Sequence, residues 1–505
     1  MSESVDPLDE SILDEAVSRN ATGTRITGTN TEPLSNFSQH DELSEKDGLA
    51  EKKPETEKPY RLWDERRKLA VMFGKVYILI MVVFIGVLSL YWGSIYRREY
   101  RVANMKMLVV IEDSQVQLTN STTAPELLGE AVRGLINESS TYGDFRFANV
   151  LELSEIASQH DRSLFEEVEK QVHEQKYWAC IYVNATASQI VYDLLSSGNA
   201  LSVYAFQLQY IVSAVYESGR HFSALSQYVT KNLRIMESLW LSNFAPHVYA
   251  TMVENYLTDD QRQNLVRSSN STQVPSALSV LPSINMVDQR LSLSSTVLGP
   301  SELGLIYAQI FSFHQFNFSV DLHNSVKDKL QFGHYILYRI MISQCNHFVL
   351  ALVYSLMTIA FRVPIDSAFG GPGFLILWLT MFLFISASGG INETVVSWIL
   401  YKDKKALLAP FMIFYIVINI APTFAPLVLS PGFYRYGYAT PMYNAYEALK
   451  VVFFNTWRGT LGRNYGILGA WIVASNLSLI LVLKRISDAT KEEVNKKKGR
   501  LNSKS

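Results

Sequence analysis

Carboxylate and amide side chains inside apolar segments have the clearest potential for chemistry in this sequence. Asn392 and Glu393 follow a run of small residues, Ser386 to Gly390, in the apolar segment 374–397, and Glu447 lies in a later aromatic-rich segment. Polar groups are costly in lipid and usually face a bundle interior or a cavity, where they mark substrate or ion pathways. We therefore take Asn392, Glu393 and Glu447 as candidates for a translocation path.

Each carboxylate also has a plainer interpretation. Glu393 stands near the end of its segment, so it could lie among lipid headgroups or pair with Lys402 or Lys404. Glu447 alternates with Lys450 at helical spacing and is open to the same interpretation. The sequence does not decide between a translocation path and a structural role at these positions.

Other chemistry has weaker support. There is no Gly-x-x-x-x-Gly-Lys-[Ser/Thr] loop, so active transport would need a partner ATPase or an ion gradient. Without a nucleophile–base signature we expect neither an enzyme nor a cofactor, and we expect His314 and the Cys345-Asn346-His347 cluster to be interface groups rather than metal ligands. The net charge of -2 argues against nucleic-acid binding. The two cysteines, Cys180 and Cys345, are not expected to pair.

Apolar segments long enough to cross a bilayer must position these side chains. One isolated span is predicted at 70–92, and five more within 299–486: Leu303–Phe318, Cys345–Phe361, Phe374–Ser397, Ala406–Leu429 and Tyr465–Leu483. The first of these five is short and carries Gln309, His314, Gln315 and Asn317. We include it because an even number of spans places the basic flanks of both ends on the cytosolic side.

The predicted fold is therefore an α-helical polytopic membrane protein with six spans, arranged as one plus five. Residues 1–65 form a disordered acidic cytosolic tail and 487–505 a basic cytosolic tail. Residues 93–298 form an extracytosolic α+β domain with strands at Met107–Ile111 and Trp178–Val183. Helical periodicity covers 125–136, 163–175 and much of 187–240, and 267–293 is predicted to be a loop.

Two kinds of modification site follow from this topology. The sequons at Asn120, Asn137, Asn184 and Asn270 fall in the extracytosolic segment, which predicts N-glycosylation. Ser11, Ser38 and Ser44 each precede an acidic residue by three positions, which is typical of acidophilic kinase sites and equally of a solvated acidic tail.

A short helix is predicted near 440–457, between the last two spans. Pro441 suits a helix start, and apolar residues then recur at helical spacing with Glu447 and Lys450 between them. We interpret it as an amphipathic or re-entrant helix at the outer interface with a Tyr/Trp belt.

Three strings of residues carry a resemblance to a known family. They are Gly-Pro-Ser-Glu-Leu-Gly-Leu-Ile-Tyr at 299–307, Phe-Tyr-Arg-Tyr-Gly-Tyr-Ala-Thr-Pro-Met-Tyr-Asn at 433–444 and Leu-Gly-Arg-Asn-Tyr-Gly-Ile-Leu at 461–468. Between about Arg66 and Ile486 the chain resembles the fungal nitrosoguanidine-resistance membrane protein family. That family looks like the membrane half of type-2 ABC exporters, which implies a large outer domain and a re-entrant helix before the last span.

The resemblance implies a permease-like protein that contributes to efflux or tolerance of toxic compounds, or to lipid distribution across the membrane. The partners expected are membrane lipid and a small-molecule or lipid substrate, with a homodimer by analogy to related permeases. A scaffold or regulator of other transporters is the alternative, because no energy-coupling motif is present. The plasma membrane is the expected location, with the endoplasmic reticulum as the alternative.

Overall fold

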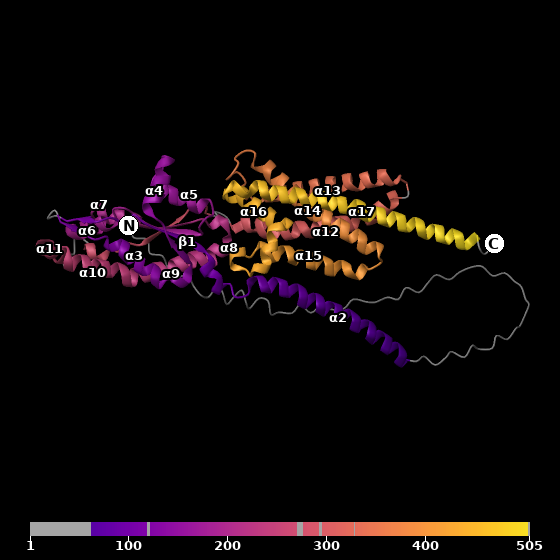
Figure 1. The fold of residues 1–505 in the computed structure, drawn as a ribbon, viewed down its shortest axis with the longest axis horizontal. Coiled ribbons are helices and arrows are strands. Elements are labelled where there is room, and N and C mark those ends of the chain that lie inside the picture. The colour runs from indigo at the N-terminus through magenta and orange to yellow at the C-terminus, as the bar shows by residue number, and fades with distance from the viewer. Residues whose placement is uncertain (1–61, 119–121, 270–275, 292–294, 328, 503–505) are drawn as a thin grey trace, which may run out of the picture. The chain divides into compact units, whose positions relative to one another are not determined.

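The structure is a computed structural model that describes residues 62–118, 122–269, 276–291, 295–327 and 329–502 (Figure 1). The predicted sites Asn120, Asn270, Ser11, Ser38 and Ser44 lie outside these residues. Contacts between Cα atoms divide the chain at Leu69, and the fold described below is that of the second unit, from Ala70 onward. The first predicted span belongs to helix α2, Leu62–Ile95.

The described residues between 99 and 298 form a lobe around a sheet of five strands, in the order β4-β1-β5-β6-β7. The strands are β1 (Lys106–Ile111), β4 (Asp144–Phe147), β5 (Ala179–Val183), β6 (Val212–Tyr216) and β7 (Ile284–Asp288), with a small separate ladder of β2 (Val116–Gln117) and β3 (Thr123–Ala124). All neighbours in the larger sheet are parallel except β5 and β6. Since helices alternate with these strands, the lobe is an α/β domain rather than the predicted α+β domain.

Helices cover both faces of this sheet, which explains why β5 and β6 are buried along their whole length and β1 everywhere except at Lys106. One face packs on α3 (Leu127–Glu138), α6 (Ala187–Ser197), α9 (Lys231–Leu239) and α10 (Ala245–Asn255), and the other on α4 (Val150–Gln159) and α5 (Leu164–His173). Shorter helices α7 (Val203–Gln207) and α8 (Phe222–Ala224) and helix α11 (Asp259–Ser269) complete the lobe.

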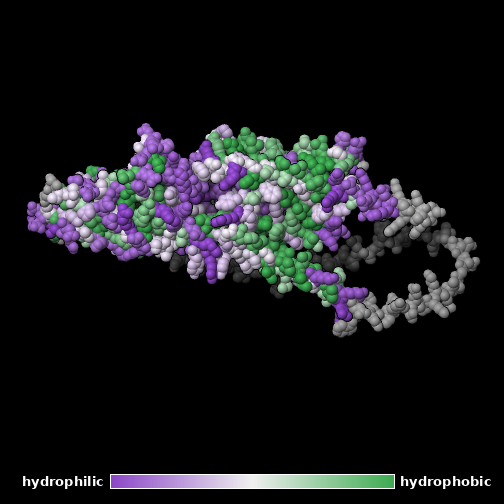
Figure 2. Space-filling model, viewed as in Figure 1, coloured by the Kyte–Doolittle hydropathy of each residue, from purple (hydrophilic) through white to green (hydrophobic). Residues whose placement is uncertain are grey.

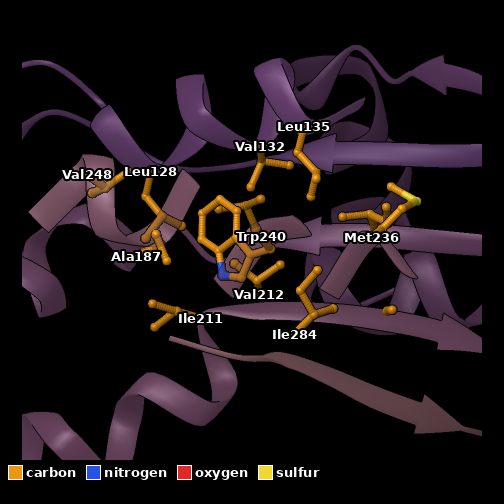
Figure 3. Packing of buried hydrophobic residues seen from close by; sticks show 14 of the residues in the cluster. Leu128, Val132, Leu135, Ala187, Ile211, Val212, Met236, Trp240, Val248 and Ile284 are labelled. Atoms are coloured by element: carbon orange, nitrogen blue, oxygen red, sulfur yellow. The ribbon is translucent and has the colours of Figure 1, made fainter. Parts of the chain in front are cut away.

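The larger core centres on Trp240, whose side chain is fully buried (Figure 3). The figure shows Leu128 and Val132 from α3 and Val212 from β6 around its indole ring. The indole N–H donates to the carbonyl of Pro282 at 2.6 Å, which satisfies the one polar group of a large apolar side chain.

Asp113 fixes the two helices that begin at the carboxyl end of the sheet. Its carboxylate accepts hydrogen bonds from the backbone N–H of Gly129 at 2.9 Å and from the N–H and hydroxyl of Ser188 at 2.9 and 2.6 Å. A carboxylate is favourable at helix N-termini because the backbone N–H groups there have no helical partner. Asp113 thus lies beyond the carboxyl ends of the parallel strands β1 and β5, the edge at which α/β sheets usually bind ligands.

Helices α12 to α17 pack side by side in a bundle (Figure 1). Their bounds are α12 Gly304–Lys327, α13 Phe332–Ala360, α14 Gly373–Tyr401, α15 Leu408–Thr423, α16 Pro441–Phe454 and α17 Leu461–Asn502. Figure 2 shows hydrophobic residues gathered over the bundle and hydrophilic residues over the lobe. Within the described residues, five helices are long and apolar enough to cross a membrane: α2, α13, α14, α15 and α17. The chain is therefore an integral membrane protein.

The short predicted span at Leu303–Phe318 corresponds to α12, which is not among these five helices. Its 24 residues would extend about 36 Å, longer than the ~30 Å hydrocarbon core of a bilayer. Its polar residues lower its hydropathy, but Gln309 and Ser312 are buried. Ser312 accepts a hydrogen bond from Asn392 of α14 at 3.0 Å. The structure thus shows a bundle helix at this position, and the count of six spans stays a prediction.

Helix α14 lies at the centre of the bundle. It packs against α12, α13, α16 and α17. In its most apolar stretch 56% of the residues are buried, against 28% or less in the other four apolar helices. Small residues make this possible. A Cβ on Gly389 would collide with the ring of His347 on α13, and one on Gly390 would collide with the hydroxyl of Ser475 on α17.

Helix α16 confirms a helix near 440–457, with Pro441 at its first position. Its burial argues against the amphipathic alternative, since all but two of its 14 residues are buried, and the re-entrant alternative stays a prediction. The bundle covers one side through α14, α15 and α17, and the lobe reaches the other at Arg220. Helix α17 runs beyond the predicted end of the membrane domain to Asn502, so the basic segment after 487 continues a helix through that residue.

Candidate functional site

Two cavities in the described part of the chain lie at opposite ends of the bundle helices, and one candidate residue from the sequence, Glu447, lines the second of them. The lower cavity, of about 650 Å³, lies between the C-terminal ends of α12 and α14, the start of α13 and the C-terminal half of α17. The upper cavity, of about 270 Å³, lies between the lobe, the end of α15, α16 and the start of α17.

A buried ion pair stands at the wall of the lower cavity. Arg339 of α13 lines the cavity, and its Nε and Nη2 atoms donate to one carboxylate oxygen of Glu393 at 3.0 and 2.5 Å. Nη1 donates to the hydroxyl of Tyr335 at 3.1 Å, and Nη2 also donates to Ser397 at 3.4 Å. The side chains of Arg339 and Glu393 are only 5% and 4% exposed. A charge so buried needs a partner, and Glu393 supplies it.

This pairing corrects one interpretation of Glu393. The sequence suggested Lys402 or Lys404 as the partner, yet the carboxylate turns inward to α13. Lys402 instead lies over the rings of Trp398 and Tyr401, each 5.0 Å away. Arg339 is not among the candidate residues from the sequence. The signal that could have identified it is a basic residue inside an apolar helix.

Asn392 lies in the contact between α12 and α14 and lines neither cavity. Its amide donates to Ser312 and, at 3.4 Å, to the carbonyl of Gln309. The Oδ1 atom of Asn392 and both side-chain polar atoms of Gln309 are buried without a hydrogen-bond partner among the described residues. Such groups are costly in a bundle interior, so they mark a place where water or a polar ligand would be stabilised.

Further polar side chains continue from Asn392 toward the upper cavity. Ser388 lies one turn before Asn392 on α14 and close to Tyr415 of α15. Asn419 follows one turn later, donates to the carbonyl of Tyr415 at 2.9 Å and accepts from the N–H of Met442 at 3.3 Å. Thr423, another turn on, donates to the carbonyl of Asn419 at 2.6 Å and lines the upper cavity. The polar stripe, as it is called below, consists of the buried residues Glu393, Asn392, Ser388, Tyr415, Asn419 and Thr423.

Glu447 lines the upper cavity and pairs with Lys450 on the same helix. The Lys450 ammonium donates to Glu447 at 2.7 Å and to the backbone carbonyl of Arg220 at 2.8 Å. The side chain of Glu447 is 13% exposed and that of Lys450 is 5% exposed, so this pair is not a solvated surface bridge. It ties α16 to the loop that follows β6 in the lobe.

Arg220 and His221 form the lobe side of the upper cavity. The guanidinium of Arg220 donates to the carbonyls of Tyr177 and Gln175 at 2.6 and 3.0 Å and stacks 3.8 Å from the ring of Trp178. Burial lowers the pKa of Arg220 to about 10, despite the nearby charge of Glu447. Burial also lowers the pKa of His221 well below its ordinary value, and the charges of Lys450 and Arg98 act in the same direction. His221 is therefore neutral at pH 7.

The predicted glycosylation sites that fall in described residues lie on the lobe. Asn137 is exposed near the end of α3. Asn184 is half-buried after β5, and its Oδ1 accepts from the N–H and hydroxyl of Thr186 at 3.0 and 3.1 Å. Their modification stays a prediction. Among the described residues, no group of three or more His, Cys, Asp or Glu side chains could hold a metal ion, and Cys180 and Cys345 are unpaired.

This combination of apolar helices, lobe and buried polar stripe defines a multispanning membrane protein with a large insert. The chain belongs to the family described as "Protein of unknown function (DUF3533)", which matches residues 76–477. It is 26% identical over 434 residues to an uncharacterized endoplasmic reticulum membrane protein of Saccharomyces cerevisiae, an alignment that covers 86% of this chain and 83% of the relative. No solved structure matches.

Proposed function

We propose that this protein is a permease-like membrane protein that moves amphiphilic compounds or lipids between the two sides of the membrane. The observation that carries the proposal is the polar stripe, which links the wall of the lower cavity to the lining of the upper one. Buried polar residues in membrane helices are costly and mark pathways. A protein whose helices served only as an anchor would not need them.

The biological outcome follows from the same hypothesis. The resemblance of the 433–444 string to the nitrosoguanidine-resistance family supports a contribution to tolerance of toxic compounds or to lipid distribution. The yeast relative is described as an endoplasmic reticulum membrane protein, which supports residence there over the plasma membrane.

Uptake of a radiolabelled toxic compound and of a fluorescent lipid tests this proposal in a strain that lacks the protein. Wild-type protein should restore the normal uptake of at least one of them. The double variant Arg339→Met/Glu393→Leu, which removes both buried charges, and the nearly isosteric Glu447→Gln and Thr423→Val should fail to restore it at normal protein levels. Lys404→Gln is the matched control, because Lys404 is exposed and lines neither cavity.

The alternative, a non-transporting scaffold or regulator, makes the opposite prediction. The three variants would then restore uptake as well as wild type, and only deletion of the lobe or of the N-terminal tail would abolish function. Uptake that is unchanged for both probes when the protein is absent would also contradict the permease proposal.

A further inference from the structure

The lining of the lower cavity combines apolar and basic side chains. Its apolar part, called the apolar wall below, comes from α12, α13, α14, α17 and the link between α12 and α13: Phe316, Val320, Leu330, Phe332, Leu400, Leu483 and Ile486. Its basic part is Lys327, Arg339 and Lys491. A volume of about 650 Å³ is within the range of ligand-binding pockets.

The charged side chains that line this cavity are all basic among the described residues. Arg339 is neutralised by Glu393, but neither Lys327 nor Lys491 forms an ion pair with any residue that the structure describes. No Asp or Glu occurs among the described residues that line the cavity. Two ammonium groups at the mouth of a pocket attract an anion from the adjoining solvent or headgroup layer.

Two buried side chains of the cavity lining, His323 and Arg339, have unused hydrogen-bonding capacity among the described residues. The Nδ1 atom of His323 is buried and has no hydrogen-bond partner among the described residues, and His323 is only 4% exposed. Its ring is fixed by Phe316, at 5.9 Å, and by Tyr338, at 5.7 Å. The Arg339 guanidinium has five N–H donors, of which four make the hydrogen bonds given above.

We propose that the lower cavity binds the anionic headgroup of a membrane phospholipid. The phosphate lies between Lys327 and Lys491, within reach of His323 and the remaining donor of Arg339, while an acyl chain runs along the apolar wall. A free phosphate ester shares the headgroup chemistry, but it would not use the apolar wall. This inference rests on the proposed function and names the substrate class, but binding is measurable without transport.

The test uses the full chain in detergent micelles with lipid retention measured by native mass spectrometry. The probes are phosphatidic acid, phosphatidylcholine with the same acyl chains, and inorganic phosphate as a competitor. Wild type should retain phosphatidic acid over phosphatidylcholine. The double variant Lys327→Gln/Lys491→Gln should bind phosphatidic acid about 10- to 30-fold more weakly, given roughly 1 kcal/mol per lysine near an anionic surface.

Two further variants separate the outcomes. Lys404→Gln/Lys405→Gln removes the same charge from the same end of the bundle but outside the cavity, and should bind like wild type. Leu400→Trp fills the apolar wall and should weaken lipid binding while it leaves phosphate binding intact. Equal retention of the two lipids, equal loss in both double-lysine variants, or normal lipid binding by Leu400→Trp would each overturn the proposal. Unchanged uptake in the strain that lacks the protein, together with intact lipid binding by the purified chain, would contradict the permease function alone.

Discussion

Arg339 on α13 is joined to Glu393 on α14 through two hydrogen bonds to a single carboxylate oxygen, and both side chains are almost completely buried. The pair joins two bundle helices beside the lower cavity. Its surroundings include the rings of Phe316 and Tyr335, 5.2 and 5.8 Å from the guanidinium. Removal of one partner leaves an uncompensated charge among these rings.

Loss of one partner should therefore be far more harmful than loss of both. Arg339→Met should destabilise the protein by about 3–5 kcal/mol, whereas Arg339→Met/Glu393→Leu should recover most of this stability. Thermal unfolding of the purified chain in detergent measures both effects. If the double variant is as unstable as the single one, the pair is held by more than charge compensation. If the permease proposal holds, the double variant is stable but does not restore uptake.

Acidification should weaken the fold through His221. Because its folded-state pKa lies well below the ordinary value of about 6.5, the unfolded chain binds the proton more readily. Stability is complete well above pH 6.5 and falls as the pH drops below that value, by on the order of 1 kcal/mol at pH 5.5 from this residue. His221→Asn keeps a residue suited to start α8 and should flatten the pH dependence of the melting temperature.

The control for His221 is His247, which lies exposed on α10. His247→Asn should leave the pH dependence of the melting temperature as in wild type. If the melting temperature of His221→Asn falls between pH 7.5 and 5.5 as much as that of wild type, protonation of His221 does not cause the loss of stability.

Close packing at Gly389 should be intolerant of a methyl group. In Gly389→Ala the new Cβ meets the ring of His347, so this buried ring or α13 itself must shift, at a cost of about 1–3 kcal/mol. Gly469→Ala is the matched control, because a Cβ there has no neighbour within 4 Å and alanine favours the helix by up to about 1 kcal/mol. Equal melting temperatures for the two variants would contradict the central position of α14.

The sequence predicts the bundle helices but not two of the strands in the lobe. Long apolar runs and Pro441 were sufficient to locate the bundle helices and α16, since length and hydropathy are local properties. Strand β6 lies inside the segment predicted to be helical, because a buried strand of five residues has no period that separates it from a helix. Strand β7 likewise lies inside a predicted loop, where only its pairing with β6 defines it.

The candidate site shows the same limit. Glu393 and Glu447 were recognisable as polar residues in apolar surroundings, but their partners were not. Arg339 is 54 positions away from Glu393, and Arg220 is 230 positions away from Lys450, so only the fold brings them together. The role of the 433–444 string also depends on the fold: Tyr434 donates to the carbonyl of Leu90 on α2 at 2.7 Å, which joins the first span to the bundle.

Cysteine accessibility tests most directly the central claim, that the two cavities open on opposite sides of the membrane. In a Cys345→Ser background, where Cys180 is buried, Lys327→Cys, Lys491→Cys and Arg463→Cys are labelled one at a time with a membrane-impermeant maleimide in sealed microsomes. We predict labelling of the first two from the cytosolic side and of Arg463→Cys only after the lumen is opened. Labelling of all three from the same side would contradict the polar stripe as a path across the membrane.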